Sequence, residues 1–401
     1  MNRSLLQGVR VIDFGRYIAG PYAGWLLATL GAEVIRIEKF GGSEDRFVSP
    51  LFHNADGSDG DGAMYYQNNS LKKIIGLNPK SEQGQKIQRQ LIASADVVLA
   101  NMPEDGLKKM GIDYASLKAI KPDIIFTWVT ALGSEGPWAH KAGFDGIAQA
   151  MAGSMFFTGT PGHPVKTSAP YVDNSTAMTA AMGTLAALWH KEKTGEGQLV
   201  EASLLASAVS IFAPMLCEQG ATQINRQPNG SRSQTSGPSD VFKTRDGHVI
   251  VHVVGNALFK RLAKALGKEA WLNDESLNSD NKRGQNRDRI CEEIQPWFLA
   301  RTNEEVLNIL GEMSVPAGPV LNMQEAIDHP QVKGMNLQVK VNAPELKFPA
   351  PLSRAPFRLE KTEIKIPEKP AAIGQHTEEV LLSLGYSKSE IKNLKAEGHV
   401  E

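Results

Sequence analysis

Residues 9–38 read VRVIDFGRYIAGPYAGWLLATLGAEVIRIE and carry the strongest structural signal in the chain. The apolar run Val9–Phe14 is typical of a buried parallel strand, and an apolar helical segment follows at Tyr22–Leu30. Gly31 can end that helix, and Glu33–Glu38 supplies the next strand. The chain is therefore predicted to begin with a strand–helix–strand unit.

The same alternation continues toward the middle of the chain. Further strands are expected at Lys73–Asn78, Asp96–Asn101 and Asp123–Thr130, and an amphipathic helix connects the first two. Strands that alternate with helices of this length predict an α/β fold with a doubly wound, mostly parallel, Rossmann-like sheet. The Gly-, Asp- and Ser-rich segment Phe40–Ala63 interrupts this rhythm and is expected to be a long surface loop.

The composition changes at Gln223–Asp240, which is rich in turn residues and small polar residues. A β-hairpin turning at Asp246-Gly247 is expected within Val241–Val253, and a helix should follow it. We therefore expect a second, smaller α+β domain at residues 225–318, between parts of the large domain at 1–224 and 319–401. Two short helices are expected near the C-terminus, at Thr377–Leu384 and Lys388–Ala396.

Composition limits the classes of function. The 401 residues include 43 basic and 44 acidic side chains, so no general nucleic-acid or acidic-membrane surface is expected. Cys217 and Cys291 form no CxxC pattern, which argues against a disulfide framework or a thiolate metal cluster. The N-terminus lacks the apolar core of a signal peptide, and no run reaches the roughly 18 apolar residues of a membrane span. A cytoplasmic protein is expected.

Several familiar motifs do not occur in the chain: GxSxG, HExxH and GxxxxGK[ST] are missing, and the His residues have no metal-ligand spacing. A nicotinamide-binding fingerprint is the nearest rival, because Glu38 ends the second strand. The spacing of Gly15, Gly20 and Gly24 does not fit it, and Pro21 lacks the N–H that a pyrophosphate cradle needs. A dehydrogenase is therefore a weak second choice, and no metal site is predicted.

Asp173 lies between the apolar pair Tyr171-Val172 and a helix of small residues. Taken locally, Asp173 or Asn174 would cap that helix, because Asp and Asn side chains accept hydrogen bonds from free N–H groups at a helix start. The alternative is a nucleophilic carboxylate, which is already ionised at neutral pH and needs no general base.

Six stretches in chain order carry a resemblance to a known family. They are residues 6–39, NNSLKKIIGLN at 68–78, ADVVLANMPEDGLKKMGIDY at 95–114, GFDGIAQAMAG at 143–153, residues 169–204 with the TGEGQ turn, and SVPAGPVLNMQEAIDHPQV at 314–332. Together they resemble the class III CoA-transferases, the CaiB/BaiF family that includes formyl-CoA transferase. The resemblance implies a transferase that moves CoA from an acyl-CoA to a carboxylic acid, with no permanently bound cofactor, and an interlocked homodimer.

The resemblance also implies roles for individual residues. Asp173 matches the catalytic aspartate, which would form covalent intermediates with the acyl group and with CoA. The positions that match CoA contacts of the family are Tyr17, Ile18, Ala19, Lys39, Lys72, Lys73, Asn101, Met102 and Lys109. Gly230 and Gly237 match the family's glycine loop in rough position, as oxyanion donors or as ordinary turn glycines.

Two alternatives to a transferase stay open at this point. The racemase branch of the same family carries a His where Phe144 stands here, directly after the Gly of GFDG. That branch shifts the proton next to the thioester carbonyl, which needs an acid–base pair. A carrier of acyl-CoA without chemistry is disfavoured by the presence of Asp173.

Overall fold

The computed structural model describes residues 4–54, 56–343 and 346–401. The contacts divide the chain into two compact units. The first contains the described residues up to Ala152, Thr167–Leu216 and the chain from Pro330 onward, and the second contains Gly153–Lys166 and Cys217–His329. The domain boundaries predicted at residues 224 and 318 differ from these, and no prediction placed Gly153–Lys166 in the second unit.

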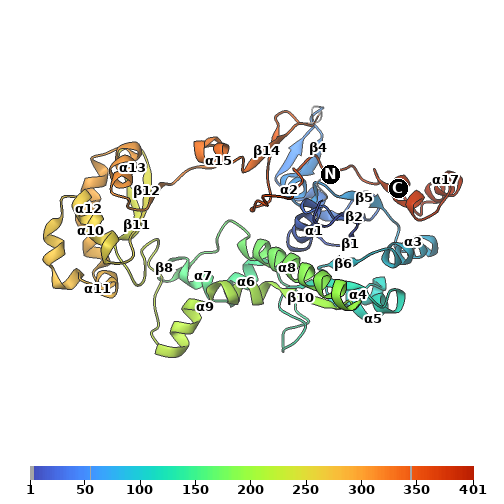
Figure 1. Cartoon of the computed structure of the whole chain (residues 1–401), viewed down its shortest axis with the longest axis horizontal. Coiled ribbons are helices and arrows are strands. Elements are labelled where there is room, and N and C mark those ends of the chain that lie inside the picture. Colours follow the sequence, from blue (N-terminus) through green and yellow to red (C-terminus); the bar gives the residue numbers. More distant parts are fainter. Residues whose placement is uncertain (1–3, 55, 344–345) are drawn as a thin grey trace. The chain divides into compact units, whose positions relative to one another are not determined.

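The first unit is built on a parallel sheet, as predicted, and the sheet has six strands, one more than expected (Figure 1). Its strands are β1 (Arg10–Asp13), β2 (Glu33–Glu38), β5 (Lys73–Gly76), β6 (Val97–Ala100), β7 (Ile125–Thr130) and β10 (Leu199–Ser203). Their order is β10-β7-β6-β1-β2-β5, so the direction of strand addition reverses between β1 and β6. In open α/β sheets, ligands bind outside the carboxyl ends of the strands at such a switch point.

Helices cover both faces of this sheet. The helices of the first unit are α1 (Ala19–Thr29), α2 (Ala63–Asn69), α3 (Glu82–Ala93), α4 (Glu104–Met110), α5 (Tyr114–Ile120), α6 (Asp145–Met151), α8 (Tyr171–Thr194), the first part of α9 (Leu204–Thr222), α15 (Pro330–Gly334), α16 (Thr377–Ser383) and α17 (Lys388–Ala396). The last two confirm the expected C-terminal helices. On one face, α1 and α8 lie side by side (Figure 1).

Successive strand residues feed two separate cores, since side chains alternate between the faces of a sheet. Val11 and Val97 pack with the helix residues Trp25 and Leu27 on the α1 and α8 face. Ile12 packs on the opposite face, with residues of α3, α16 and α17. The Thr127 and Thr184 hydroxyls lie 2.6 Å apart and fasten α8 to β7. The site-bearing start of α8 therefore belongs to a helix fixed on the sheet.

The segment Phe40–Ala63 differs from the expected long loop. It contains a 3-10 turn, η1 (Glu44–Phe47), and a hairpin of β3 (Leu51–His53) and β4 (Asp59–Gly62). Asp45 and Arg46 are buried, because ion pairs with the sheet draw this segment into the interior. A second hairpin pairs β14 (Gln338–Val341) with β15 (Ala350–Ser353).

The second unit contains the predicted hairpin, β11 (Ser239–Lys243) with β12 (His248–His252), extended by β13 (Ala317–Pro319). A small hairpin pairs β8 (Gly159–Thr160) with β9 (His163–Pro164). The helical elements of this unit are α7 (Ser154–Phe157), α10 (Asn256–Ala265), η2 (Glu269–Asn273), η3 (Glu275–Leu277), α11 (Asp280–Gln285), α12 (Arg287–Leu299), α13 (Asn303–Glu312) and α14 (Met323–Asp328). Its own apolar core includes Phe242 and Phe298, whose rings stack.

Helix α9 is unusual among the described helices. By length and composition alone it is apolar enough to cross a membrane, which differs from the expectation drawn from uninterrupted apolar runs. Only 17% of its apolar window is buried. Ser207, Ser210 and Glu218 lie within the helix, so its apolar surface is interrupted by polar side chains. An exposed apolar surface of this kind usually marks an interaction site.

Candidate active site

Asp173 lies in the first turn of α8 but does not cap the helix. The residue before the helix, Pro170, offers no side-chain cap. Instead, the Asp145 Oδ2 atom accepts the backbone N–H of Val172 at 2.8 Å and that of Asp173 at 3.1 Å. The local interpretation of Asp173 as a cap is therefore wrong, because a carboxylate from α6 fills that role and leaves the Asp173 side chain available.

Asp145 is held firmly in this position. It is buried at the first residue of α6, and its Oδ1 atom accepts a hydrogen bond from the Gln149 side chain. The Gln149 Oε1 atom in turn accepts the backbone N–H of Thr167 at 3.0 Å. Helix α6 therefore fixes both the start of α8 and the chain that leads into it.

The Asp173 carboxyl is half-buried, and none of the described residues donates a hydrogen bond to it. Burial raises the pKa of this carboxyl to about 7, and the negative charge of Asp145 contributes to the rise. A position in the first helical turn would favour the ionised form. Burial and Asp145 outweigh that effect, so Asp173 has the basic, poorly solvated carboxylate that a nucleophile needs.

A ring contact links this site to the loop between β1 and α1. Phe144, next to Asp145, meets the Tyr17 ring edge to face at 5.8 Å between centroids. Both rings are exposed, Phe144 by 65%. The loop with the predicted CoA contact Tyr17 therefore meets the residue that precedes α6, within the first unit.

The switch point of the sheet brings further predicted CoA positions to the same edge. Asn101 directly follows β6, and its side chain bonds both the backbone N–H and the carbonyl of Arg16 at 2.7 Å each. The Met102 carbonyl accepts the Trp128 indole N–H at 3.0 Å. Ile18 and Ala19 form the start of α1 and directly follow Arg16 and Tyr17 in the same loop. These predicted positions lie together at the carboxyl ends of β1 and β6.

Two of the predicted lysines are exposed. Lys39 directly follows β2 at the carboxyl edge of the sheet, and its Nζ atom lies 3.2 Å from a Glu44 carboxylate oxygen. Lys109 is exposed on α4, the helix that follows β6. Both side chains are long and solvated, and a lysine contacts phosphate as a point charge.

Lys72 does not fit the predicted phosphate contact. Its side chain is fully buried, and Nζ donates to Asp13 Oδ2 at 2.7 Å, to the Pro21 carbonyl at 2.7 Å and to Asn69 Oδ1 at 2.9 Å. All three donor sites of the ammonium are therefore used inside the protein. Burial lowers the pKa of Lys72 to about 8. The residue ties α1 and α2 to the end of β1.

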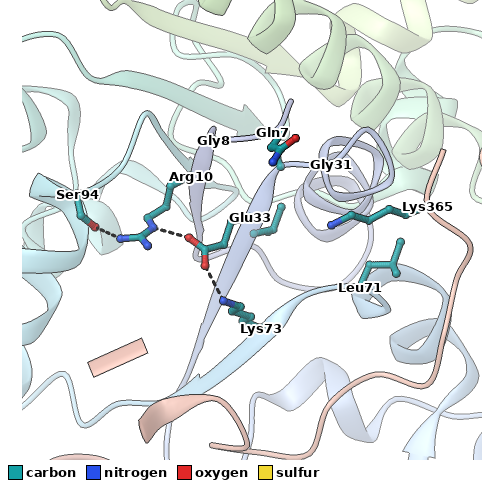
Figure 2. Close-up of a pocket in the computed structure, with 11 residues that line it drawn as sticks. Gln7, Gly8, Arg10, Gly31, Glu33, Leu71, Lys73, Ser94 and Lys365 are labelled. Atoms are coloured by element: carbon teal, nitrogen blue, oxygen red, sulfur yellow. Dashed lines mark hydrogen bonds and ion pairs between the residues drawn. The ribbon is translucent and has the colours of Figure 1, made fainter. Parts of the chain in front are cut away.

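Lys73 lies at the wrong edge of the sheet for a contact in the switch-point site. It begins β5, and its Nζ atom pairs with Glu33 and Glu379 at 2.6 Å each. Figure 2 shows Lys73 beside Glu33, which also pairs with Arg10, in a hollow of about 540 Å³. Since parallel strands start at one edge and end at the other, this hollow lies across the sheet from Tyr17 and Asn101.

Comparison with known proteins identifies the family. The family model for CoA-transferase family III matches residues 6–377. The chain belongs to CoA-transferase family III.

It is 33% identical to a succinate–glutarate CoA-transferase of Agrobacterium fabrum over 94% of this chain and 95% of that protein. It is 30% identical to a mouse succinyl-CoA:glutarate CoA-transferase over 99% and 90%. The crystal structure of a CaiB/BaiF family protein from Brucella suis matches with a TM-score of 0.84 at 28% identity, covering 96% of this chain and 100% of that chain. The protein is thus an enzyme that transfers CoA.

The role of Asp145 in this family III CoA-transferase was missed from the sequence. In the sequence, the GFDG segment indicates only the family resemblance, which implies no role for its acidic residue. A signal was present, since Asp145 and Gln149 are one helical turn apart before a helix that has no capping residue of its own.

A second carboxylate organises the loop after β7. The Glu201 side chain, from β10, accepts the Ser134 backbone N–H at 2.7 Å and the Thr130 hydroxyl at 3.2 Å. Thr130 also accepts the Gly133 N–H at 3.1 Å. Thr130, which ends β7, therefore orders the loop that leads toward Gly143 and the Asp145 segment.

The two glycines proposed for an oxyanion loop belong to the second unit. Gly230 has a φ of 69°, and its N–H donates to the Gly159 carbonyl at 2.9 Å, so this donor is already engaged. Gly237 is buried, and a side chain there would meet the Arg283 backbone at 3.1 Å. Close packing explains Gly237 without a role in catalysis, and its oxyanion role stays a prediction.

Proposed function

We propose that this CoA-transferase works through covalent intermediates on Asp173. The observation that carries the proposal is the Asp173 carboxyl itself, which is half-buried, receives no hydrogen bond from the described residues and has a pKa raised to about 7. Neither a structural ion pair nor a helix cap explains such a group. Near neutral pH a large fraction is ionised, and that fraction is poorly solvated and therefore reactive.

In the first half-reaction, an Asp173 carboxylate oxygen attacks the thioester carbonyl of the acyl-CoA. The C–S bond breaks, the CoA thiolate leaves, and a mixed acyl-aspartyl anhydride forms. The thiolate then attacks the aspartyl carbonyl of this anhydride. The donor acid leaves as a free carboxylate, and the enzyme holds an aspartyl-CoA thioester.

The second half-reaction reverses these steps with the acceptor acid. The acceptor carboxylate attacks the aspartyl thioester, the thiolate leaves again, and a new anhydride forms. Attack of the thiolate on the acceptor carbonyl gives the new acyl-CoA and restores the Asp173 carboxylate. Each step exchanges one nucleophile for another, so atoms and charges balance without a metal, a redox cofactor or a proton donor.

We place CoA at the carboxyl edge of the sheet, over the switch point between β1 and β6. The loop residues Tyr17, Ile18 and Ala19 and the pair Asn101 and Met102 meet there, and the Tyr17–Phe144 contact leads from them toward Asp173. Lys39 and Lys109 supply positive charge to the phosphates. Lys72 and Lys73 are left out of this placement because of their burial and their position.

We infer that the acceptor is a dicarboxylic acid and that the donor is succinyl-CoA. The support is the names of the relatives, which act on succinate, succinyl-CoA and glutarate. The racemase alternative needs a base beside the substrate α-carbon. Phe144 stands where that branch has its His, and an aromatic hydrocarbon cannot carry a proton.

We further propose a homodimer that works in the cytoplasm. Apolar side chains are exposed along α8 and α9, including Met178, Met182, Trp189, Val209 and Ile211. Water-exposed apolar surface on two adjoining helices is costly unless it is covered. A second copy of the chain would cover it, and the near-zero net charge of −1 does not oppose self-association.

The proposal is tested by following CoA exchange from succinyl-CoA to isotopically labelled glutarate by mass spectrometry. We expect transfer with the native protein, and a loss of at least about a thousandfold in kcat with the isosteric variant Asp173→Asn. The affinity for CoA should change little, because Asp173 is not placed on the phosphates. Transfer at near-native rate by Asp173→Asn would rule out the covalent mechanism.

A further inference from the structure

The loop between β1 and α1 is held almost wholly by side chains from outside it. The Gly15 N–H donates to Asp13 at 2.6 Å, and the Gly15 carbonyl accepts from Arg36 at 2.8 Å. Asn101 takes both backbone groups of Arg16. The Tyr17 N–H donates to Asp45 Oδ2 at 3.1 Å, and its carbonyl accepts from Asn68 at 3.3 Å. All six polar backbone groups of residues 15–17 are therefore fixed.

Tyr17 adopts a strained backbone conformation. Its φ of 63° lies in the left-handed region, where a residue with a Cβ atom is strained. Such strain persists only where the surroundings impose it. Two hydrogen bonds hold the Tyr17 backbone, one to Asp45 and one from Asn68. Only the bond to Asp45 involves a charged group.

Asp45 is aligned by a buried guanidinium. Arg36 donates from one nitrogen to both carboxylate oxygens of Asp45 at 2.8 Å, and both side chains are essentially buried. Arg36 also donates to Glu38 at 2.9 Å, and its remaining nitrogen reaches the Gly15 carbonyl. The same guanidinium thus touches the loop directly and orients the carboxylate that holds Tyr17.

We propose that Asp45, oriented by Arg36, is a positioning residue for CoA, because it sets the β1–α1 loop in its binding conformation before CoA arrives. The proposal rests on the proposed function, which places CoA on Tyr17, Ile18 and Ala19. Asp45 lies in the segment Phe40–Ala63, so this segment contributes to CoA binding through the loop. Preorganisation of this kind lowers the ordering cost of binding.

The chain offers a matched control in the same ion network. Asp61 accepts from Arg46 at 2.6 Å, and Arg46 in turn pairs with Glu38 at 3.2 Å. Within the described part of the chain, Asp61 forms no hydrogen bond or ion pair with residues 15–17. Asp61→Asn therefore removes one charge from the network, as Asp45→Asn does, and leaves the loop untouched. If Asp45 contributed to stability alone, the two variants would have the same CoA affinity.

The experiment measures CoA affinity by calorimetry and the thermal unfolding midpoint for the native protein, Asp45→Asn and Asp61→Asn. Both variants should unfold at lower temperature. We expect about tenfold weaker CoA binding for Asp45→Asn, as for the loss of one charge-assisted hydrogen bond, and a change within about twofold for Asp61→Asn. Equal affinity of Asp45→Asn and the native protein, or equal weakening in both variants, would overturn the proposal.

A second variant protects the test if Asp45→Asn does not fold. Arg36→Lys keeps the charge but loses the separate nitrogens that reach Asp45, Glu38 and the Gly15 carbonyl, so CoA affinity should fall in the same direction. Unchanged affinity in a folded Arg36→Lys would contradict the proposal. Absence of CoA binding by the native protein would refute the proposed function and this inference together, whereas native binding with an unaffected Asp45→Asn refutes only the inference.

Discussion

Asp145 accepts the backbone N–H of Asp173, at 3.1 Å, with the same oxygen that accepts the N–H of Val172. The free N–H groups that begin α8 are thus partly satisfied by a side chain from α6. As a result, the Asp173 carboxylate does not fold back on its own helix. Burial raises the pKa of the Asp173 carboxyl, and the negative charge of Asp145 adds to the rise.

The first prediction concerns the pH dependence of turnover. Asp173 attacks as a carboxylate, so the rate should fall as the pH falls through the pKa of about 7. Asp145→Asn removes the nearby charge but keeps an oxygen that can accept the N–H groups. We expect the acid limb of the kcat/KM profile, which reports ionisable groups of the free enzyme, to move toward lower pH. An acid limb that stays in place would show that Asp145 does not influence Asp173.

The second prediction concerns stability. The pKa of Asp173 is raised on folding, so the folded state binds more protons than the unfolded state between pH 4 and 7. The contribution of Asp173 to stability is therefore fully present below about pH 4 and is lost as the pH rises through about 7. Asp173→Asn removes this dependence. In urea unfolding, the variant should be more stable than the native protein by up to about 4 kcal/mol at pH 8 and lose this advantage at pH 4. The same difference at both pH values would contradict the raised pKa.

The third prediction compares two lysines at opposite edges of the sheet. Lys39→Ala removes an exposed charge next to the proposed phosphate position and should weaken CoA binding about fivefold, with a smaller dependence on salt. Lys73→Ala removes a charge at the amino edge, where its partners are Glu33 and Glu379. Its CoA affinity should match that of the native protein. The reverse pattern would place the phosphates at the amino edge.

The fourth prediction tests the proposed homodimer by sedimentation. Met182 is 65% exposed on α8, within the apolar surface that a second copy would cover. Met182→Glu puts a charge there and should shift the protein from dimer to monomer. Leu382→Glu on α16 is the control, since Leu382 is 40% exposed outside that surface. A native protein that sediments as a monomer would refute the dimer.

Most of the parallel sheet was predictable because buried strands read as apolar runs. Val9–Phe14 and Glu33–Glu38 correspond to β1 and β2, and Gly31 follows the end of α1 as expected. The strand β10 was not predicted. Leu199–Ser203 contains a charged residue, Glu201, and directly follows the TGEGQ turn, so it does not form an apolar run. The buried η1 was missed as well, because charged residues such as Asp45 and Arg46 indicate a surface unless their partners are known.

The candidate site was predictable only in part. The family resemblance indicated Asp173 and the loop at Tyr17, but a resemblance gives positions without contacts. The two adjacent lysines, Lys72 and Lys73, illustrate this limit, since one is buried on Asp13 and the other points to Glu33. The spacing of Asp145 and Gln149 marks a side-chain pair on one helix, but it does not indicate the contact with Asp173, because that contact joins two helices across 28 residues of chain.

Trapping of the covalent intermediate tests the catalytic role of Asp173 most directly. The native protein is incubated with succinyl-CoA and hydroxylamine, digested, and analysed by peptide mass spectrometry. Hydroxylamine attacks an aspartyl anhydride or thioester and leaves a hydroxamate on the aspartate. We predict this label on Asp173, dependent on succinyl-CoA and missing in Asp173→Asn. A label on another residue, or turnover with an unlabelled Asp173 under conditions that trap acyl groups, would contradict the mechanism.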